Sequence, residues 1–247
     1  MTTDQTTALP SELRTALLSV AEPAHAPAMR AYMRDQFAFL GVRTPQRRSA
    51  CKPLLLALKG QPAARLLELS ALLWEEPERE FQYVAIDLLA LHWKQFDCSH
   101  LPALLALVQR RSWWDSVDGL AGVIGDVLRH RHDGMDTAIM HDNLWVRRIA
   151  LLHQLGWRAQ TDADRLFRYA LQCAHEDEFF IQKAIGWALR DYARHDAQAV
   201  LNFTAQHQQR LAPLSYREAN KHLQNPGSGR ASVQPQPQPQ PLPLCPT

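Results

Sequence analysis

Apolar side chains recur every three or four residues along most of the chain, from residue 11 to about residue 224. This spacing is typical of helices with one buried face, and no segment shows the strict alternation of a half-buried strand. Several of the helical segments begin near an aromatic residue, at intervals of thirty-one to thirty-six residues. These aromatic residues are Phe81, Trp114, Trp145, Phe180 and Tyr216.

A shorter apolar segment lies between some of these helices, such as LPALLALVQR before Trp114. A helix pair every thirty-odd residues is typical of an α-solenoid, in which each unit buries its apolar face against its neighbours. We therefore expect an all-α superhelix of HEAT-like repeats over residues 11–224, whose second helices line a concave basic groove. Residues 1–10 are expected to be flexible, and the Gln/Pro-rich residues 225–247 lack the apolar area for a core and are expected to be a disordered tail.

The segment SWWDSVDG places two tryptophans and two aspartates at one predicted helix start. Ser112 is expected to be the N-cap and Asp115 to interact with the first backbone N–H groups, while Trp113 begins the apolar stripe. Trp114 and Asp118 share another face, among small residues. This face fits a close helix contact, with Asp118 paired to a neighbouring arginine, or a surface that approaches a ligand.

Two later segments carry cations beside aromatic or apolar residues. Lys183, Trp187 and Arg190 share one predicted helix face, which resembles an aromatic platform inside a positive nucleic-acid groove. Arg148 shares a face with leucines, so its guanidinium requires an anion, either a protein carboxylate or a phosphate.

The segment GVRTPQRR is predicted to end one helix at Gly41 and to begin the next at Thr44-Pro45. Arg43, Arg47 and Arg48 then lie near a helix N-terminus, which favours anion binding, although a solvated basic helix is a common alternative. Across the proposed groove the sequence offers many cations and one prominent carboxylate, Asp118. A carboxylate there is useful if the ligand develops positive charge.

The overall charge, formally +2 from 27 Lys+Arg and 25 Asp+Glu, neither requires nor excludes a polyanionic partner. The four cysteines are far apart and predict reduced thiols, and no segment has the features of a secretory signal or a membrane span. We expect a cytoplasmic protein, a monomer by default.

These segments resemble the bacterial DNA alkylation repair glycosylases of the AlkD type, which are built from HEAT-like repeats. The stretches that carry the resemblance include MRAYMRDQFAFLGVRTPQRR, SWWDSVDGLAGVIGD, DNLWVRRIALL and EFFIQKAIGWALRDYA. The resemblance implies a monofunctional N-glycosylase that acts on double-stranded DNA containing alkylated bases and needs no cofactor or metal. It implies excision of N7-alkylguanine and N3-alkyladenine, without flipping the base into a pocket, and an abasic product.

The resemblance also assigns roles to particular residues. It places the catalytic aspartate at Asp118, two sugar-contacting tryptophans at Trp114 and Trp187, and a supporting tyrosine at Tyr32. It places a DNA-contacting arginine at Arg148. We further expect Lys183, Arg190 and the Arg43–Arg48 segment to hold phosphates.

Two alternatives remain open from the sequence. A non-catalytic HEAT-like scaffold that binds DNA or protein is the default for the fold alone. A metal site is the other, because the connection HRHDGMDTAIMHD is rich in histidine and aspartate, although its spacing matches no standard ligand pattern.

Overall fold

The computed structural model describes residues 4–223, and these residues form a stack of helices with no strand among them. One isolated β-bridge joins Ala38 to Glu78. The α-helices are α1 (Asp4–Leu18), α2 (Ala26–Tyr32), α3 (Thr44–Leu56), α4 (Ala63–Glu75), α5 (Arg79–Leu91), α6 (Leu101–Val108), α7 (Trp114–Leu128), α8 (Met135–Ala138), α9 (Leu144–Leu152), α10 (Ala163–Gln172), α11 (Phe179–Tyr192), α12 (Ala197–Gln206) and α13 (Pro213–Asn220). Single 3-10 turns lie at Pro23–His25, Trp93–Gln95, Cys98–His100 and Arg158–Gln160.

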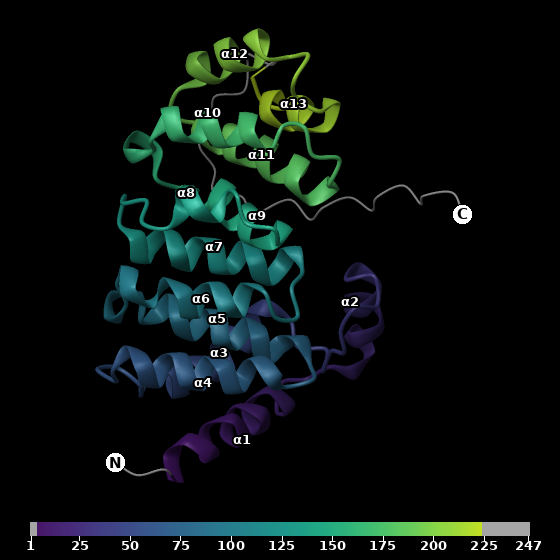
Figure 1. Ribbon diagram of the computed structural model, residues 1–247. Coiled ribbons are helices and arrows are strands. Elements are labelled where there is room, and N and C mark those ends of the chain that lie inside the picture. The colour runs from purple at the N-terminus through teal and green to yellow at the C-terminus, as the bar shows by residue number, and fades with distance from the viewer. Residues whose placement is uncertain (1–3, 224–247) are drawn as a thin grey trace.

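The helices from α4 onward form two rows that run the length of the molecule (Figure 1). The second helices of the pairs contact one another in order, α5 with α7, α7 with α9, α9 with α11 and α11 with α13. The first helices, α4, α6, α8, α10 and α12, form the other row. This arrangement confirms the predicted all-α solenoid of HEAT-like repeats and the division of each pair into a first and a second helix.

The core is a continuous apolar layer between the two rows. On α7 the predicted stripe of Val117, Leu120 and Ile124 is fully buried. Trp113 differs from the prediction, because it precedes the helix as its N-cap residue and is only partly buried. Its ring packs on Trp145 and Phe180, which begin the next two second helices.

Two glycines in the second helices are required by close helix packing. A Cβ at Gly125 of α7 would overlap the carbonyl oxygen of His153, at the end of α9. A Cβ at Gly186 of α11 would overlap the side chain of Glu218 on α13. The small residues at these two positions therefore serve contact between helices of the protein itself.

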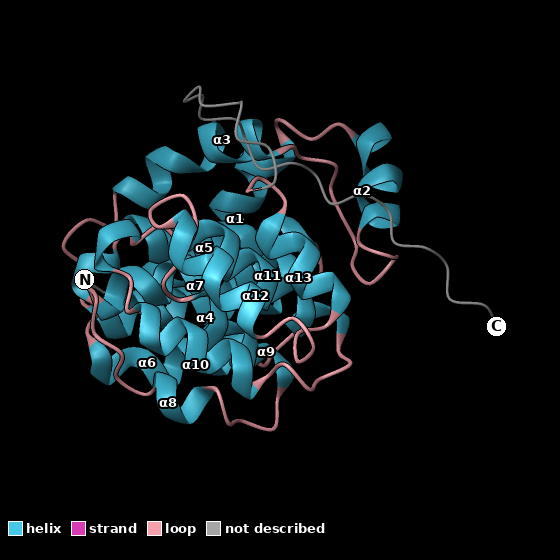
Figure 2. Cartoon of the chain, turned by 90° about the horizontal axis from the view of Figure 1, so that it is seen from above, coloured by secondary structure: helices cyan, strands magenta, loops and turns pink. Residues whose placement is uncertain are grey.

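Helix α2 stands apart from the stack and lies beside the row of second helices (Figures 1 and 2). It ends at Tyr32, so the predicted helix end at Gly41 is wrong. Gly41 instead has φ +91° where the chain passes the backbone of Glu22, too close for any Cβ. The carboxylate of Glu80, fully buried at the start of α5, accepts hydrogen bonds from the backbone N–H groups of residues 40–42 and holds this loop.

The N-terminal segment contributes a helix to the stack. Helix α1 begins at Asp4, so most of the segment expected to be flexible is helical, with Pro10 inside the helix. Leu13 and Leu17 are fully buried and anchor α1 to the stack. The predicted tail, residues 225–247, lies outside the described residues. Among the helices within residues 4–223, none is long and apolar enough to cross a membrane.

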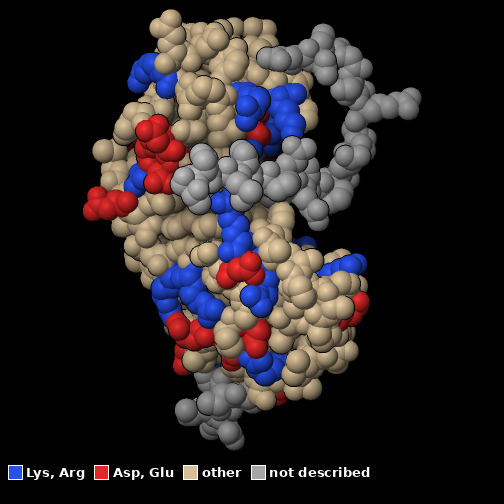
Figure 3. Space-filling model, turned by 90° about the vertical axis from the view of Figure 1, so that its right-hand side faces the viewer, with Lys and Arg blue, Asp and Glu red and all other residues tan. Residues whose placement is uncertain are grey.

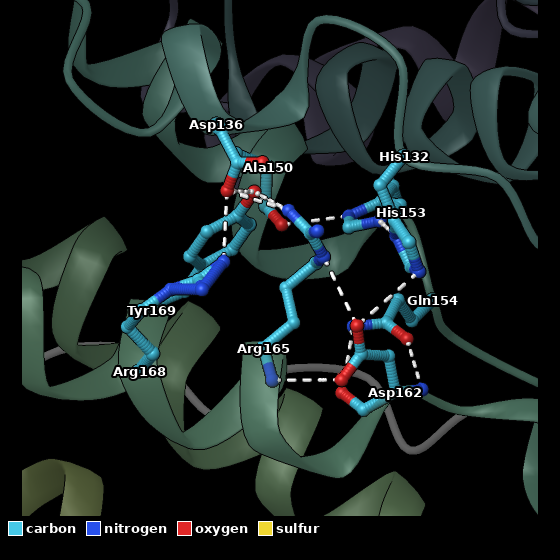
Figure 4. A network of polar contacts seen from close by, with 9 residues as sticks. All are labelled: His132, Asp136, Ala150, His153, Gln154, Asp162, Arg165, Arg168 and Tyr169. Atoms are coloured by element: carbon cyan, nitrogen blue, oxygen red, sulfur yellow. Dashed lines mark hydrogen bonds and ion pairs between the residues drawn. The ribbon is translucent and has the colours of Figure 1, made fainter.

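A polar network lies where α8 and α10 of the first-helix row meet α9 of the second (Figure 4). Asp136 binds Arg165, Arg168 and the hydroxyl of Tyr169. The hydrogen bond from Arg165, assisted by that from Tyr169, lowers the pKa of Asp136 to about 2.

Nearby, His153 is buried with Nδ1 2.7 Å from the carbonyl oxygen of Ala150 and Nε2 3.0 Å from Nδ1 of His132. Burial lowers the pKa of His153 to about 3. Neutral His153 therefore donates to Ala150 and accepts from His132.

The packing at Gly125 predicts opposite effects for two alanine substitutions on α7. Gly125→Ala forces a methyl group against His153 and is expected to lower the free energy of unfolding by about 1–3 kcal/mol. Gly122→Ala, where a Cβ meets nothing within 4 Å, is expected to raise it by about 0.5–1 kcal/mol through helix propensity. Urea unfolding followed by circular dichroism measures both, and equal effects of the two substitutions would contradict the packing described.

The buried His153 predicts acid-sensitive stability. An unfolded histidine titrates near pH 6.5, and His153 in the folded protein titrates near pH 3, so the unfolded chain binds the additional proton in between. The free energy of unfolding is expected to fall as the pH decreases from about 6.5 towards 3, by up to about 1.4 kcal/mol per pH unit. Asp136, with its lowered pKa, adds to the loss only below about pH 4.

Urea unfolding at one-unit steps between about pH 7 and pH 4 tests this dependence, with His153→Gln as the comparison. The variant should show a flatter profile, since it removes the group that takes up the proton. An equally steep profile in the variant would show that other groups cause the dependence.

Candidate functional site

Asp118 and Arg148 form an ion pair between α7 and α9. Arg148 Nε lies 2.7 Å from Asp118 Oδ1, and Nη2 lies 2.9 Å from Oδ2. The arginine side chain is 1% exposed, whereas that of Asp118 keeps 21% of its surface exposed. The guanidinium is thus a buried support, and the carboxylate is the member of the pair that reaches the surface.

The environment of Asp118 acts on its acidity in two directions. Burial raises the pKa of Asp118, and the charge and hydrogen bonds of Arg148 oppose that shift. The net direction is upward. Arg148 is therefore the group that favours the ionised form of a carboxylate in a largely dry setting.

Aromatic rings lie on both sides of this pair. The guanidinium carbon of Arg148 is 5.4 Å from the centroid of the Trp187 ring, and its Nη1 donates to the carbonyl oxygen of Phe180. Trp114, one turn before Asp118 on α7, meets the ring of Tyr32 edge-to-face at 5.8 Å. The four residues predicted to be catalytic thus lie around this pair, Tyr32 at the end of α2, Trp114 and Asp118 on α7, and Trp187 on α11.

Arg148 differs from its predicted role as a DNA contact. Its guanidinium is buried, and each of its three nitrogens donates to Asp118 or Phe180, so it has no surface to offer a phosphate. Of the two partners that the sequence left open, the structure gives it the carboxylate. Arg148 is a positioning residue for Asp118 in this geometry.

Arg47 and Arg48 also have a protein partner. Both bind Asp87 on α5, Arg47 at 3.0 Å and Arg48 at 3.2 Å. The side chain of Arg47 is 6% exposed, which removes it from the set of phosphate contacts, whereas that of Arg48 is 66% exposed. Arg43 is exposed and its Nη2 lies 2.7 Å from Nε2 of His25. Arg43 and Arg48 therefore remain the accessible cations of this segment.

Lys183 and Arg190 both donate hydrogen bonds to the carboxylate of Glu218, on α13. The distances are 2.7 Å from Lys183 Nζ to Oε1 and 2.6 Å from Arg190 Nη1 to Oε2. Asp118 is therefore not the only prominent acid of this surface, as the sequence had indicated. Glu218 was missed, although it stands two residues after Tyr216, the aromatic start of the last repeat.

The charged side chains on this side of the molecule do not form one continuous basic surface. Figure 3 looks at the side on which α2 lies, and shows Lys and Arg in separate groups, several of them with Asp or Glu beside them.

Asp115 has a different partner from the one expected of a capping residue. Helix α7 starts at Trp114 without a side-chain cap, and Ser112 donates to Val108 instead. Asp115 accepts hydrogen bonds from the fully buried Arg79 at 2.6 and 2.9 Å and from the hydroxyl of Tyr83 at 2.6 Å. It ties the start of α7 to α5, and so fixes where Trp114 and Asp118 lie.

The histidine-rich connection after α7 forms local polar contacts. Arg131 pairs with Asp133, and His132 with His153. Within residues 4–223, no group of three or more His, Cys, Asp or Glu side chains is arranged to hold a metal ion.

Residues 13–223, nearly the whole described chain, match the model of the DNA alkylation repair enzyme family. The chain belongs to this family. It is 35% identical to a predicted DNA alkylation repair enzyme from Enterococcus faecalis, with a TM-score of 0.76 over 82% of this chain and 96% of that one. Membership of the family supports a role in DNA repair, and therefore binding to DNA.

Two more distant structures share the fold. AlkD2 from Streptococcus mutans is 17% identical, with a TM-score of 0.56 over 69% of this chain and 87% of its own. The protein smu.31 from Streptococcus mutans UA159 is 15% identical, with a TM-score of 0.56 over 78% and 98% of the two chains. No curated protein matches the chain.

The buried ion pair predicts a large cost for removing the arginine alone. Arg148→Met leaves Asp118 without its counter-charge and is expected to lower the free energy of unfolding by about 3–5 kcal/mol. In the double variant Arg148→Met/Asp118→Asn the expected loss is smaller than the sum of the two single losses, because no uncompensated charge remains. Urea unfolding of the three variants measures the coupling, and strictly additive losses would contradict it.

Proposed function

We propose that this protein is a monofunctional DNA N-glycosylase that excises cationic alkylated purines, N7-alkylguanine and N3-alkyladenine, from double-stranded DNA and leaves an abasic site. The observation that carries the proposal is the partly exposed carboxylate of Asp118, held by the buried Arg148, whose guanidinium also lies over the ring of Trp187. Membership of the alkylation repair family supports it.

The chemistry of the lesion explains why a single carboxylate is sufficient. Glycosyl transfer passes through an oxocarbenium-like state, and ordinary glycosidases need a second carboxyl group because their leaving groups are poor. Alkylation puts a positive charge on the purine, which leaves as a neutral base without protonation. Asp118 then stabilises the cationic sugar and orients or deprotonates the attacking water, whose oxygen forms the new bond to C1′.

The aromatic residues suit the positioning part of this reaction. Trp114 and Trp187 offer ring faces that attract a cationic nucleotide and pack on its sugar, and Tyr32 supports Trp114 from α2. Exposed Arg43 and Arg48 supply phosphate contacts.

The partial exposure of Asp118 supports a mechanism without base flipping. A cavity of about 550 Å³ lies between α10 and α12 and is lined by Phe167, Phe203 and His207 among others. It belongs to the first-helix row, away from Asp118. The carboxylate is presented on the surface of the second-helix row, where it meets a nucleotide that stays in the duplex.

Asp118→Asn tests the proposal. The variant keeps the shape of the side chain and an acceptor for Arg148 but loses the charge, so base excision is expected to fall by about 10²–10³-fold. Binding to the duplex is expected to stay close to that of the unaltered protein. The assay is single-turnover release of N7-methylguanine from a duplex oligonucleotide at saturating protein, with abasic sites revealed by alkali.

Asp126→Asn is the matched control, because Asp126 is an exposed carboxylate two turns further along α7. It should leave excision unchanged. Unchanged excision per bound complex in Asp118→Asn would refute the catalytic role of Asp118. If the unaltered protein released no base above the spontaneous rate, the non-catalytic scaffold would be the better description.

A further inference from the structure

Trp187 on α11 has a cation one turn away on either side, and both cations point to one acid. Lys183 and Arg190 precede and follow Trp187 by four and three residues, which places the three side chains on one face of the helix. Their side chains keep 22% and 19% of their surface exposed, yet both donate to Glu218.

Glu218 is built into this position by the packing of α13 on α11. The residue is 9% exposed, and the absence of a side chain at Gly186 makes room for it. Burial by itself raises the pKa of Glu218, but Lys183 and Arg190 outweigh burial and the pKa is lowered. At neutral pH the carboxylate is therefore ionised.

The pairing changes what DNA meets at this surface. Two cations beside an aromatic platform are suited to bind adjacent phosphates, but here their donors are directed at a carboxylate. To bind Lys183 or Arg190, a phosphate has to displace Glu218. The fold already holds Glu218 at hydrogen-bond distance, so the carboxylate does not lose the entropy of association that a phosphate loses. The carboxylate also repels any phosphate that approaches.

We propose that Glu218 is an internal competitor for DNA phosphates, which holds Lys183 and Arg190 away from the DNA backbone and thereby weakens binding to undamaged DNA. This inference rests on the proposed function and adds a residue that sets its specificity. Phosphate contacts carry no information on the base and dominate non-specific affinity. Reducing them on one side of Trp187 raises the share of the binding energy that depends on the cationic lesion.

The test is the affinity of Glu218→Gln for an undamaged duplex oligonucleotide, measured by fluorescence anisotropy at several salt concentrations. Gln keeps the shape but removes the charge that holds the two cations. We expect binding about tenfold tighter at low salt and a salt dependence steeper by about one to two in log–log slope, since each added phosphate contact contributes about 0.9. Affinity equal to or weaker than that of the unaltered protein would overturn the proposal.

Asp136→Asn is the control matched in charge. Asp136 also bridges two cations, Arg165 and Arg168, but on the first-helix row (Figure 4). The substitution likewise raises the net charge by one and removes the acid partner of Arg168, while Arg165 keeps Asp162 at 3.2 Å. Its affinity for undamaged DNA should stay within about twofold, and a gain equal to that of Glu218→Gln would attribute the effect to overall charge and overturn the inference.

A second variant covers the case in which Glu218→Gln does not fold at the assay temperature. Glu218→Asp keeps the charge but is one methylene shorter, so it no longer spans both cations. It should tighten binding to undamaged DNA by less than Glu218→Gln does. Thermal unfolding shows which of the two variants is folded. An unchanged affinity in a folded variant would contradict the inference.

Single-turnover excision of N7-methylguanine by the unaltered protein separates this inference from the proposed function. Excision together with an unaltered affinity in Glu218→Gln rejects only the role of Glu218. Absence of excision rejects the glycosylase, whichever way the affinity moves.

Discussion

The ion pair between Arg148 and Asp118 connects the packing of the stack to its chemistry. A buried guanidinium is stable only if its charge and its donors are satisfied, and here Asp118 and the carbonyl of Phe180 do this. Because these partners lie on α7 and α11, one side chain from α9 sets three consecutive second helices relative to one another. The same guanidinium lies against the ring of Trp187. Asp118 therefore occupies its position for a structural reason before any ligand is present.

The contacts between second helices on either side of this ion pair also contain ion pairs. Arg79 and Asp115 join α5 to α7, and Lys183 and Arg190 join α11 to α13 through Glu218. What distinguishes the pairs is how much of the acid remains exposed. The side chain of Asp115 keeps 6% of its surface and that of Asp118 keeps 21%. Two carboxylates three residues apart on α7 thus differ in role, because Asp115 anchors the helix and Asp118 keeps part of its surface exposed.

The sequence predicts the helices and their pairing well, because apolar periodicity and the recurring aromatic residues depend on local structure. It predicts the partners of charged residues poorly. Glu218 lies 28 and 35 residues away from the cations that it binds, and Arg79 lies 36 residues from Asp115. Which acid an arginine meets across a helix pair depends on how the next helix is rotated, and the spacing within one helix does not contain that information.

The failed prediction of a cap at Asp115 has the same origin. Its distance from Ser112 fits a capping role, but a buried arginine on the neighbouring helix offers a charged partner with better geometry. Likewise, the loop between α2 and α3 is set by the buried Glu80, which a local pattern does not reveal. The candidate site residues Trp114 and Asp118 stand out in the sequence because their types are unusual for the helix face on which they lie.

The paired charges bear on how such a surface distinguishes damaged from undamaged DNA. A surface of free cations binds any duplex, and the phosphates of a lesion are the same as those of its neighbours. Carboxylates among the cations reduce this uniform attraction and at the same time favour a nucleotide that carries positive charge. Asp118 and Glu218 lie on opposite sides of Trp187, linked to it through Arg148 and Arg190. Under the proposed function, discrimination then comes from the sign of the charge on the base, so that no pocket shaped to the altered base is required.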